Sequence, residues 1–148
     1  MSTLNDAKGE IQRADHLLFV TLKYTRTIDV MKSVIARLAN AYDNAIIHAL
    51  EVLKKKKKFK QIPLTPVSRA ELLRDLYKKD IIILDAMNTY FFLRKVAKAE
   101  YTKKEEFRKN VTLTVMHNEE VIEVNIKVLE EYYNKTKEFI DYINEKFK

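Results

Sequence analysis

Residues that make tight turns are almost absent from this chain, which has one glycine and two prolines among 148 residues. Sheet-rich folds join many short strands through turns that depend on such residues. A chain with so few of them has few places at which to reverse direction sharply. The sequence therefore predicts long helices joined by a small number of connections.

Apolar residues recur at helical spacing through the first third of the chain. We expect a first helix from about Asp6 to Tyr24 and a second over about Ile28–Lys57. Three β-branched threonines at 21–27 favour a kink or short turn near Thr25–Thr27, although one continuous helix is also compatible. The second helix carries a heptad seam made by Ile28, Met31, Ile35, Leu38, Tyr42, Ala45, Ala49 and Val52.

The firmest break in the chain is the segment 61–67, which contains both prolines. Ser68 and Glu71 follow it with the spacing of a capping box, in which serine and glutamate satisfy free backbone donors. This pattern predicts a third helix that starts at Arg69 and ends near Lys79.

Asp80 is placed to cap a fourth helix, and the residues from Ile81 to Leu93 leave almost no polar face. A helix that is apolar all round is normally buried on every side. We therefore expect this segment to be the central core helix, and we expect the helix to continue to about Lys109.

The hydrophobic period changes from helical to alternating over 111–126, which predicts a β-hairpin with a four-residue loop at His117–Glu120. A hairpin alone is marginally stable, so it must pack on the helices or pair with another chain. Asn125 is placed to cap a last helix.

These patterns predict one mainly α domain over 1–148: a bundle of four or five helices with one hairpin, at about 111–126, before the C-terminal helix. Hydrophobic residues make up 47% of the chain, which is ample for a core, and there is no cysteine. The polar N-terminus does not resemble a signal peptide, and no stretch is suited to span a bilayer, so we expect a cytoplasmic protein. The high content of Lys, Glu and Ile is typical of the surface of a thermophile's protein.

The positive charge is concentrated in two places. Six of the seven net charges lie in 54–60, and a second basic stretch covers 94–109. Localised positive charge attracts polyanions such as nucleic acid, whereas a lysine run at a helix end is also typical of a solvated surface. The candidate phosphate-binding residues are Lys54, Lys55, Lys56, Lys57, Lys58, Lys60, Arg94, Lys98, Lys103, Lys104, Arg108 and Lys109.

Two functions are compatible with this distribution. One is a non-catalytic accessory protein that binds nucleic acid, RNA before DNA, through the phosphates. The other is a protein–protein interaction or scaffolding module that acts as a homodimer. The first is favoured if the two basic stretches share one face of the folded chain. The second is favoured if they point apart and an apolar patch is exposed.

Recognisable catalytic chemistry is missing from the sequence. There is no nucleophile elbow, glycine-rich phosphate loop or zinc-binding H-E-x-x-H. His48 and Glu51 form a single metal-ligand couple, where di-metal bundles use two. Tyr101 and Phe107 lie in the second basic stretch and are interpreted as packing residues. The sequence thus indicates no cofactor, metal or small-molecule ligand, and it favours a protein that is not an enzyme.

The segment 39–53, ANAYDNAIIHALEVL, resembles the A-Y-x-x-A-x-x-x-A-x-x-L helix of HEPN domains. That resemblance implies an all-helical, often dimeric protein associated with RNA or with a toxin–antitoxin pair. The catalytic signature of the family, an arginine followed four to six residues later by histidine, has no match here. The resemblance therefore implies a non-catalytic member.

Overall fold

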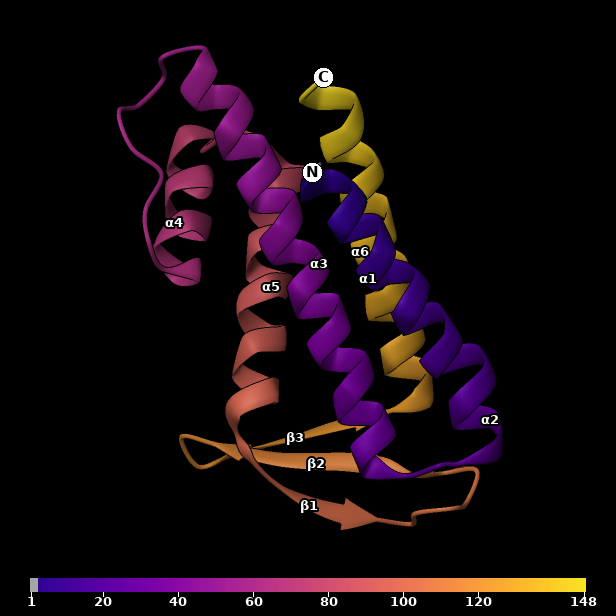
Figure 1. The fold of residues 1–148 in the computed structure, drawn as a ribbon. Coiled ribbons are helices and arrows are strands. Elements are labelled where there is room, and N and C mark those ends of the chain that lie inside the picture. Colours follow the sequence, from indigo (N-terminus) through magenta and orange to yellow (C-terminus); the bar gives the residue numbers. More distant parts are fainter. Residues whose placement is uncertain (1–2) are drawn as a thin grey trace.

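Helix α3 (Ile28–Lys55) runs the length of the molecule, and the other helices pack around it (Figure 1). The structure is a computed structural model that describes residues 3–148, apart from the side chain of Lys104. The remaining elements are α1 (Thr3–His16), the π-helical turn η1 (Leu17–Thr21), α2 (Leu22–Tyr24), α4 (Pro66–Leu76), α5 (Ile81–Lys98), β1 (Glu100–Lys104), β2 (Thr112–His117), β3 (Glu120–Asn125) and α6 (Ile126–Lys146).

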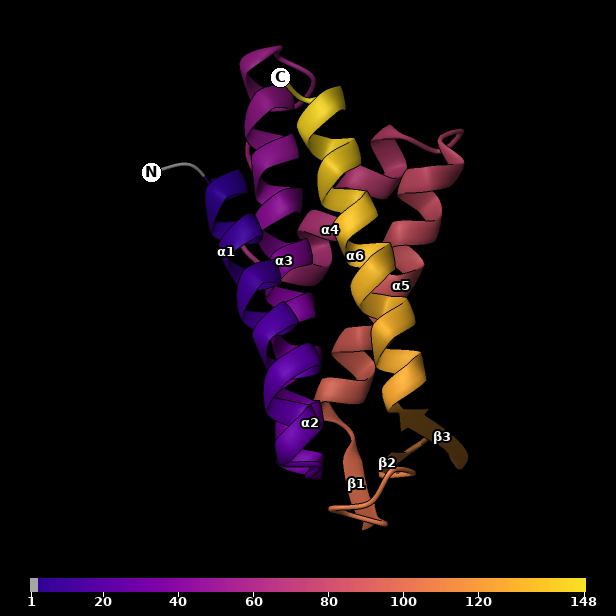
Figure 2. The ribbon, with the colours of Figure 1, turned by 90° about the vertical axis from the view of Figure 1, so that its right-hand side faces the viewer.

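The fold is mainly α, as predicted, with one continuous helical rod from α1 through η1 to α2 and four further helices in the described residues. The chain breaks at residues 25–27, and Thr27 caps α3 by accepting the backbone N–H of Val30. Figure 2 shows α6 lying along the bundle beside α1, α3 and α5. The sheet closes the end of the bundle at which α5 ends and α6 begins.

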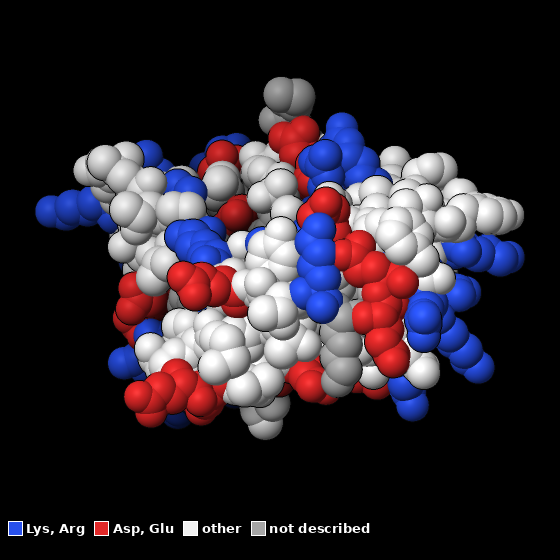
Figure 3. All heavy atoms as spheres, turned by 90° about the horizontal axis from the view of Figure 1, so that it is seen from below, with Lys and Arg blue, Asp and Glu red and all other residues white. Residues whose placement is uncertain are grey.

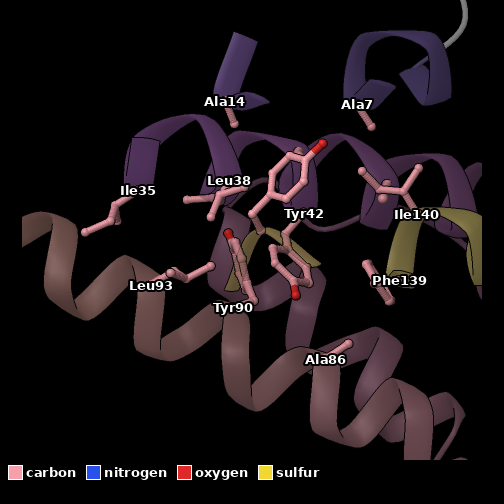
Figure 4. Close-up of a cluster of buried hydrophobic side chains, with 14 of the residues drawn as sticks. Ala7, Ala14, Ile35, Leu38, Tyr42, Ala86, Tyr90, Leu93, Phe139 and Ile140 are labelled. Atoms are coloured by element: carbon pink, nitrogen blue, oxygen red, sulfur yellow. The ribbon is translucent and has the colours of Figure 1, made fainter. Parts of the chain in front are cut away.

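The core is centred on Tyr42 of α3, which lies between Tyr90 of α5 and Phe139 of α6 (Figure 4). The ring centres are 5.9 Å apart in the first pair and 5.1 Å apart in the second. Thirteen residues of α3 are buried, including most of its heptad seam. The central helix is therefore α3.

The prediction that the fourth helix is buried on all sides was wrong. At the start of α5, Ile81 is 80% exposed and Ile82 is 51% exposed, and both line a groove between α5 and α6. Leu84, Phe91 and Phe92 are only partly buried. The first residues of an apolar helix can thus be exposed while later residues of the same helix are buried.

The predicted length of the fourth helix was also wrong. The helix ends at Lys98, and Ala99 takes an extended conformation that leads directly into β1. Strand β1 pairs antiparallel with β2, which places Tyr101 opposite Val115. The expected hairpin is therefore the larger part of a three-stranded sheet with the order β1-β2-β3.

The hairpin lies where the alternation predicted it, but its turn is tighter. The strands are joined by Asn118 and Glu119, whose φ angles are +49° and +67°. Positive φ at both central residues is typical of the two-residue turn whose twist matches that of paired strands. Asn125 then caps α6 by accepting the N–H of Val128, as predicted.

The predicted start of the third helix was three residues late. Thr65 is the N-cap, and its side-chain oxygen accepts the backbone N–H of Ser68 at 3.2 Å. Pro66 occupies the first helical position, where a missing N–H costs nothing and a fixed φ is already suitable. The helix ends at Leu76, whereas Asp80 caps α5 as expected.

Candidate functional site

The lysine run lies where α3 ends, at the end of the bundle opposite the sheet (Figure 1). Lys57 has a φ of +60°, so the run leaves the helix axis there. All six lysines of this run, at 54–58 and 60, are exposed. Phe59 is partly buried and packs against the core, so it anchors the segment that carries the charge.

Four further lysines that were not among the predicted binding residues lie at the same end. The joint between α4 and α5 carries Lys78 and Lys79, and the end of α6 carries Lys146 and Lys148. The Tyr77 ring packs on the Phe147 ring at 5.6 Å, which places this joint beside α6. His48 of α3 lies 3.0 Å from the Phe147 carbonyl oxygen. The lysine end is hereafter this set of ten: Lys54, Lys55, Lys56, Lys57, Lys58, Lys60, Lys78, Lys79, Lys146 and Lys148.

Helices α3, α4 and α6 all end in this region, and the carbonyl ends of helices carry partial negative charge. That field stabilises nearby lysines and accounts for part of their enrichment. Lys146 is itself paired with Asp80 at 3.4 Å. Lys148 is paired with Glu145 at 3.2 Å. The other eight lysines have no ion pair within the described residues.

The second basic stretch lies at the other end of the molecule, on and around the sheet. Helix α3 has 28 residues, so the two ends are separated by about 40 Å. Lys98, Lys103, Arg108 and Lys109 are exposed there, and Lys103 pairs with Glu106 at 3.6 Å. Lys104 belongs to β1, and its side chain lies outside the described part. The predicted residues therefore do not form one surface.

The sheet end does not offer a continuous basic face. In Figure 3, which views this end, blue and red side chains are interspersed with uncharged surface. Phe107 was interpreted as a packing residue, and this was wrong, since its side chain is 70% exposed at a φ of +65°. Tyr101 was interpreted in the same way, but it is 37% exposed, and Lys32 Nζ lies 4.0 Å from the centre of its ring.

Arg94 takes part in a hydrogen-bond network between helices and is not a free surface charge. Its Nη1 atom donates to the Tyr90 hydroxyl at 3.3 Å, and that hydroxyl donates to the Asp43 carboxylate. Burial raises the pKa of Asp43, against the opposing effects of the Tyr90 hydrogen bond, Arg94 and Arg69. Burial and the neighbouring Asp43 likewise raise the pKa of Tyr90. This network joins α3 to α5.

A groove of about 390 Å³ separates the first half of α5 from the second half of α6. We refer to it as the α5/α6 groove. Its floor includes Tyr42, whose pKa burial raises to about 12. The groove is lined by Tyr42, Ile81, Ile82, Asp85, Ala86, Thr89, Lys135, Glu138, Phe139 and Tyr142. Sequence reasoning missed it, because no local pattern reports how closely two distant helices approach.

The histidines do not assemble a metal centre. His48 contacts the Phe147 carbonyl, and Glu51 is exposed. Within residues 3–148 there is no group of three or more metal-ligating His, Asp or Glu side chains. No helix in the described part of the chain is long and apolar enough to cross a membrane.

Comparison of the chain with family models, with curated proteins and with solved structures finds no match. Function is therefore argued from the geometry of these surfaces.

Proposed function

We propose that the chain is a protein–protein interaction module that acts as a homodimer through the α5/α6 groove. The observation that carries this proposal is the exposure of Ile81 and Ile82 at the mouth of a groove with an aromatic floor. Large apolar side chains grouped around a depression are typical of sites that bind another protein surface. The separation of the two basic stretches by the length of α3 also favours this function over a single nucleic-acid surface.

The charges at the groove favour a second copy as the occupant. Asp85 of α5 and Glu138 of α6 are exposed acids on its lining, and Lys135 of α6 is an exposed base. A two-fold dimer brings the same patch of both copies together, so each Lys135 can face the acids of its partner. The apolar residues then meet at the centre, with complementary charge around them.

The test is the mass of the protein in solution, measured by light scattering at tens of micromolar. We expect the wild type to be a dimer, and the double variant Ile81→Ser, Ile82→Ser to be a monomer with unchanged helical content. The matched control is Met116→Ser, Val121→Ser, which removes two exposed apolar side chains from the sheet end. A monomeric wild type refutes the proposal, as does a groove variant that remains dimeric.

The second candidate function is the binding of single-stranded nucleic acid at the lysine end. It is favoured by the convergence of lysines from the end of α3, the α4–α5 joint and the end of α6. Such a surface binds phosphates with little sequence preference. A titration with RNA and DNA at several salt concentrations tests it.

A further inference from the structure

A carboxylate that is almost buried holds two arginines on the outer side of α1 and α3. Glu10 is 9% exposed and accepts from Arg13 Nη1 at 2.8 Å. Its second oxygen lies 3.3 Å from Nη1 of Arg37, which comes from α3. Charge-assisted bonds of this kind fix the position of both guanidinium groups. The two arginines are therefore preorganised relative to each other.

The cluster has positive charge left over. Two guanidinium groups share one carboxylate, and His16 stands one helical turn beyond Arg13. Each guanidinium has five N–H groups. In both Arg13 and Arg37, Nη1 is the one guanidinium nitrogen that has a hydrogen-bond partner among the described residues. Most of the donors in the cluster are thus available to a ligand.

These side chains border a shallow surface cavity of about 440 Å³ that is open to solvent. Its volume is within the range of small-ligand sites. Leu17 gives it an apolar wall, and Gln12 adds an exposed amide. The lining residues are Gly9, Gln12, Arg13, His16, Leu17 and Arg37.

The only glycine of the chain lies in this lining, in the middle of α1, where glycine destabilises a helix relative to alanine. Its backbone has no positive φ. A Cβ atom built there would meet only Arg13 Nη1, at 3.8 Å, which is an ordinary contact. The fold therefore does not require glycine at this position. A bare backbone beside the cavity instead suits the close approach of a ligand.

The α-helix also changes form at the same place. The π-helical turn begins at Leu17, directly after His16, and single π turns within α-helices are frequent at functional sites. This observation is independent of the charges and of the glycine.

We propose that this cavity binds a phosphate ester. Arg13 and Arg37 pair with the phosphate oxygens, His16 and Gln12 donate further hydrogen bonds, and the backbone at Gly9 allows the group to approach α1. Paired guanidinium groups with several free donors match the oxygens of a phosphate, and the net positive charge suits a dianion. The ester is either a free phosphorylated small molecule or the 5′-phosphate of an oligonucleotide. This site is separate from the α5/α6 groove and from the lysine end.

Calorimetric titration of the intact protein tests the proposal with inorganic phosphate, adenosine 5′-monophosphate and adenosine. We expect the monophosphate to bind at least tenfold more tightly than adenosine. Arg37→Gln should lose at least tenfold in affinity, whereas Lys8→Gln, an exposed charge on α1 outside the lining, should change it less than twofold. A parallel titration with one oligonucleotide, with and without a 5′-phosphate, identifies the source of the phosphate. If the phosphorylated oligonucleotide binds more tightly than both its unphosphorylated form and adenosine 5′-monophosphate, the ligand is an oligonucleotide end. If the monophosphate binds at least as tightly, the ligand is a free phosphorylated small molecule.

Gly9→Ala separates a ligand site from a purely structural ion-pair cluster. The change adds a helix-favouring methyl group, so the melting temperature should rise, whereas affinity for the monophosphate should fall at least fivefold. A variant that is more stable and yet binds the monophosphate more weakly is expected only if the open backbone at Gly9 contacts the ligand. Failure of phosphate, the monophosphate and the phosphorylated oligonucleotide to bind at low salt overturns the proposal. So does unchanged affinity in both Arg37→Gln and Gly9→Ala.

Discussion

The Tyr142 hydroxyl donates a hydrogen bond to the Asp80 carboxylate, joining the end of α6 to the start of α5. The same carboxylate caps α5 by accepting the N–H groups of Ile82 and Ile83 at 3.0 and 3.1 Å. It also lies 3.4 Å from Lys146 Nζ. One side chain therefore starts a helix and fixes that helix beside the lysine end and the α5/α6 groove.

Asp80→Ala should lower the free energy of unfolding by about 1–2 kcal/mol, because it removes a helix cap together with a tertiary hydrogen bond. Urea denaturation measures this difference. The control is Asp75→Ala at an exposed position of α4, which should stay within about 0.5 kcal/mol of the wild type. Equal losses in the two variants would show that the contacts of Asp80 are not stabilising.

The contribution of Asp80 should depend on pH. Burial by itself would raise the pKa of Asp80, but the hydrogen bonds from Tyr142, the Ile83 N–H and Lys146 together lower it. A carboxyl with a lowered folded-state pKa contributes stability above its unfolded pKa and loses it as pH falls through the folded value. The stability difference between wild type and Asp80→Asn should therefore shrink as the pH falls from neutral to below about 4. Urea melts across this range check it, and a constant difference contradicts it.

Leu50→Ala should destabilise the fold far more than Ile81→Ala, although both residues lie in apolar helical stretches. Leu50 is fully buried on α3, and truncation of such a side chain costs about 2–5 kcal/mol. Within one copy Ile81 is mostly exposed, so in protein diluted to the monomer its loss should change the free energy of unfolding by about 0.5 kcal/mol or less. Denaturant midpoints of the two variants measure this order. A larger loss for Ile81→Ala would place the start of α5 inside the core.

Local patterns in the sequence predicted most of the elements, because those patterns act through neighbours along the chain. The seam of α3, the caps Asp80 and Asn125 and the alternation of β2 and β3 are of this kind. Strand β1 could not be predicted, since Glu100–Lys104 has no alternating apolar pattern and is held in place by β2. The exposure of Ile81 was equally hidden, because periodicity does not report which part of an apolar helix its neighbours cover.

The candidate sites were less predictable than the fold. Charge counting located the lysine run, but Lys78 and Lys146 join it only after the chain has folded. The pairing of Arg13 with Arg37 across Glu10 depends on the contact between α1 and α3. One local signal was present, namely Gly9 inside a predicted helix. Glycine lowers the stability of a helix relative to alanine, and the fold leaves room for a Cβ atom at this position.

Asp43→Asn should gain stability relative to the wild type as the pH rises from about 4 to 7. Burial raises the pKa of Asp43, so its favourable contribution is full below the unfolded pKa and is lost as the pH rises through the folded value. The asparagine carbonyl can still accept from the Tyr90 hydroxyl. Thermal melts at several pH values measure the difference, with the surface variant Asp75→Asn as the control. A gain that grows toward acid pH instead would contradict the assigned sign.

Replacing Lys54, Lys56 and Lys58 with glutamine should weaken any binding of single-stranded RNA and flatten its dependence on salt. Each phosphate contact that is lost removes about 0.7 from the slope of log affinity against log salt concentration. The melting temperature should stay nearly unchanged, because all three side chains are exposed and have no ion pair among the described residues.

The matched control for this variant carries Lys103→Gln, Arg108→Gln and Lys109→Gln, which remove the same charge from the opposite end of the bundle. Attraction between charges is screened over about 10 Å at 0.1 M salt, so charges at the sheet end act only weakly on RNA bound at the lysine end. If the lysine end is the contact surface, the salt dependence of RNA binding by the control variant should therefore stay close to that of the wild type. If both triple variants flatten the slope equally, net charge and not the convergence of lysines is responsible. Absence of RNA binding at low salt would make these lysines a solvated helix end.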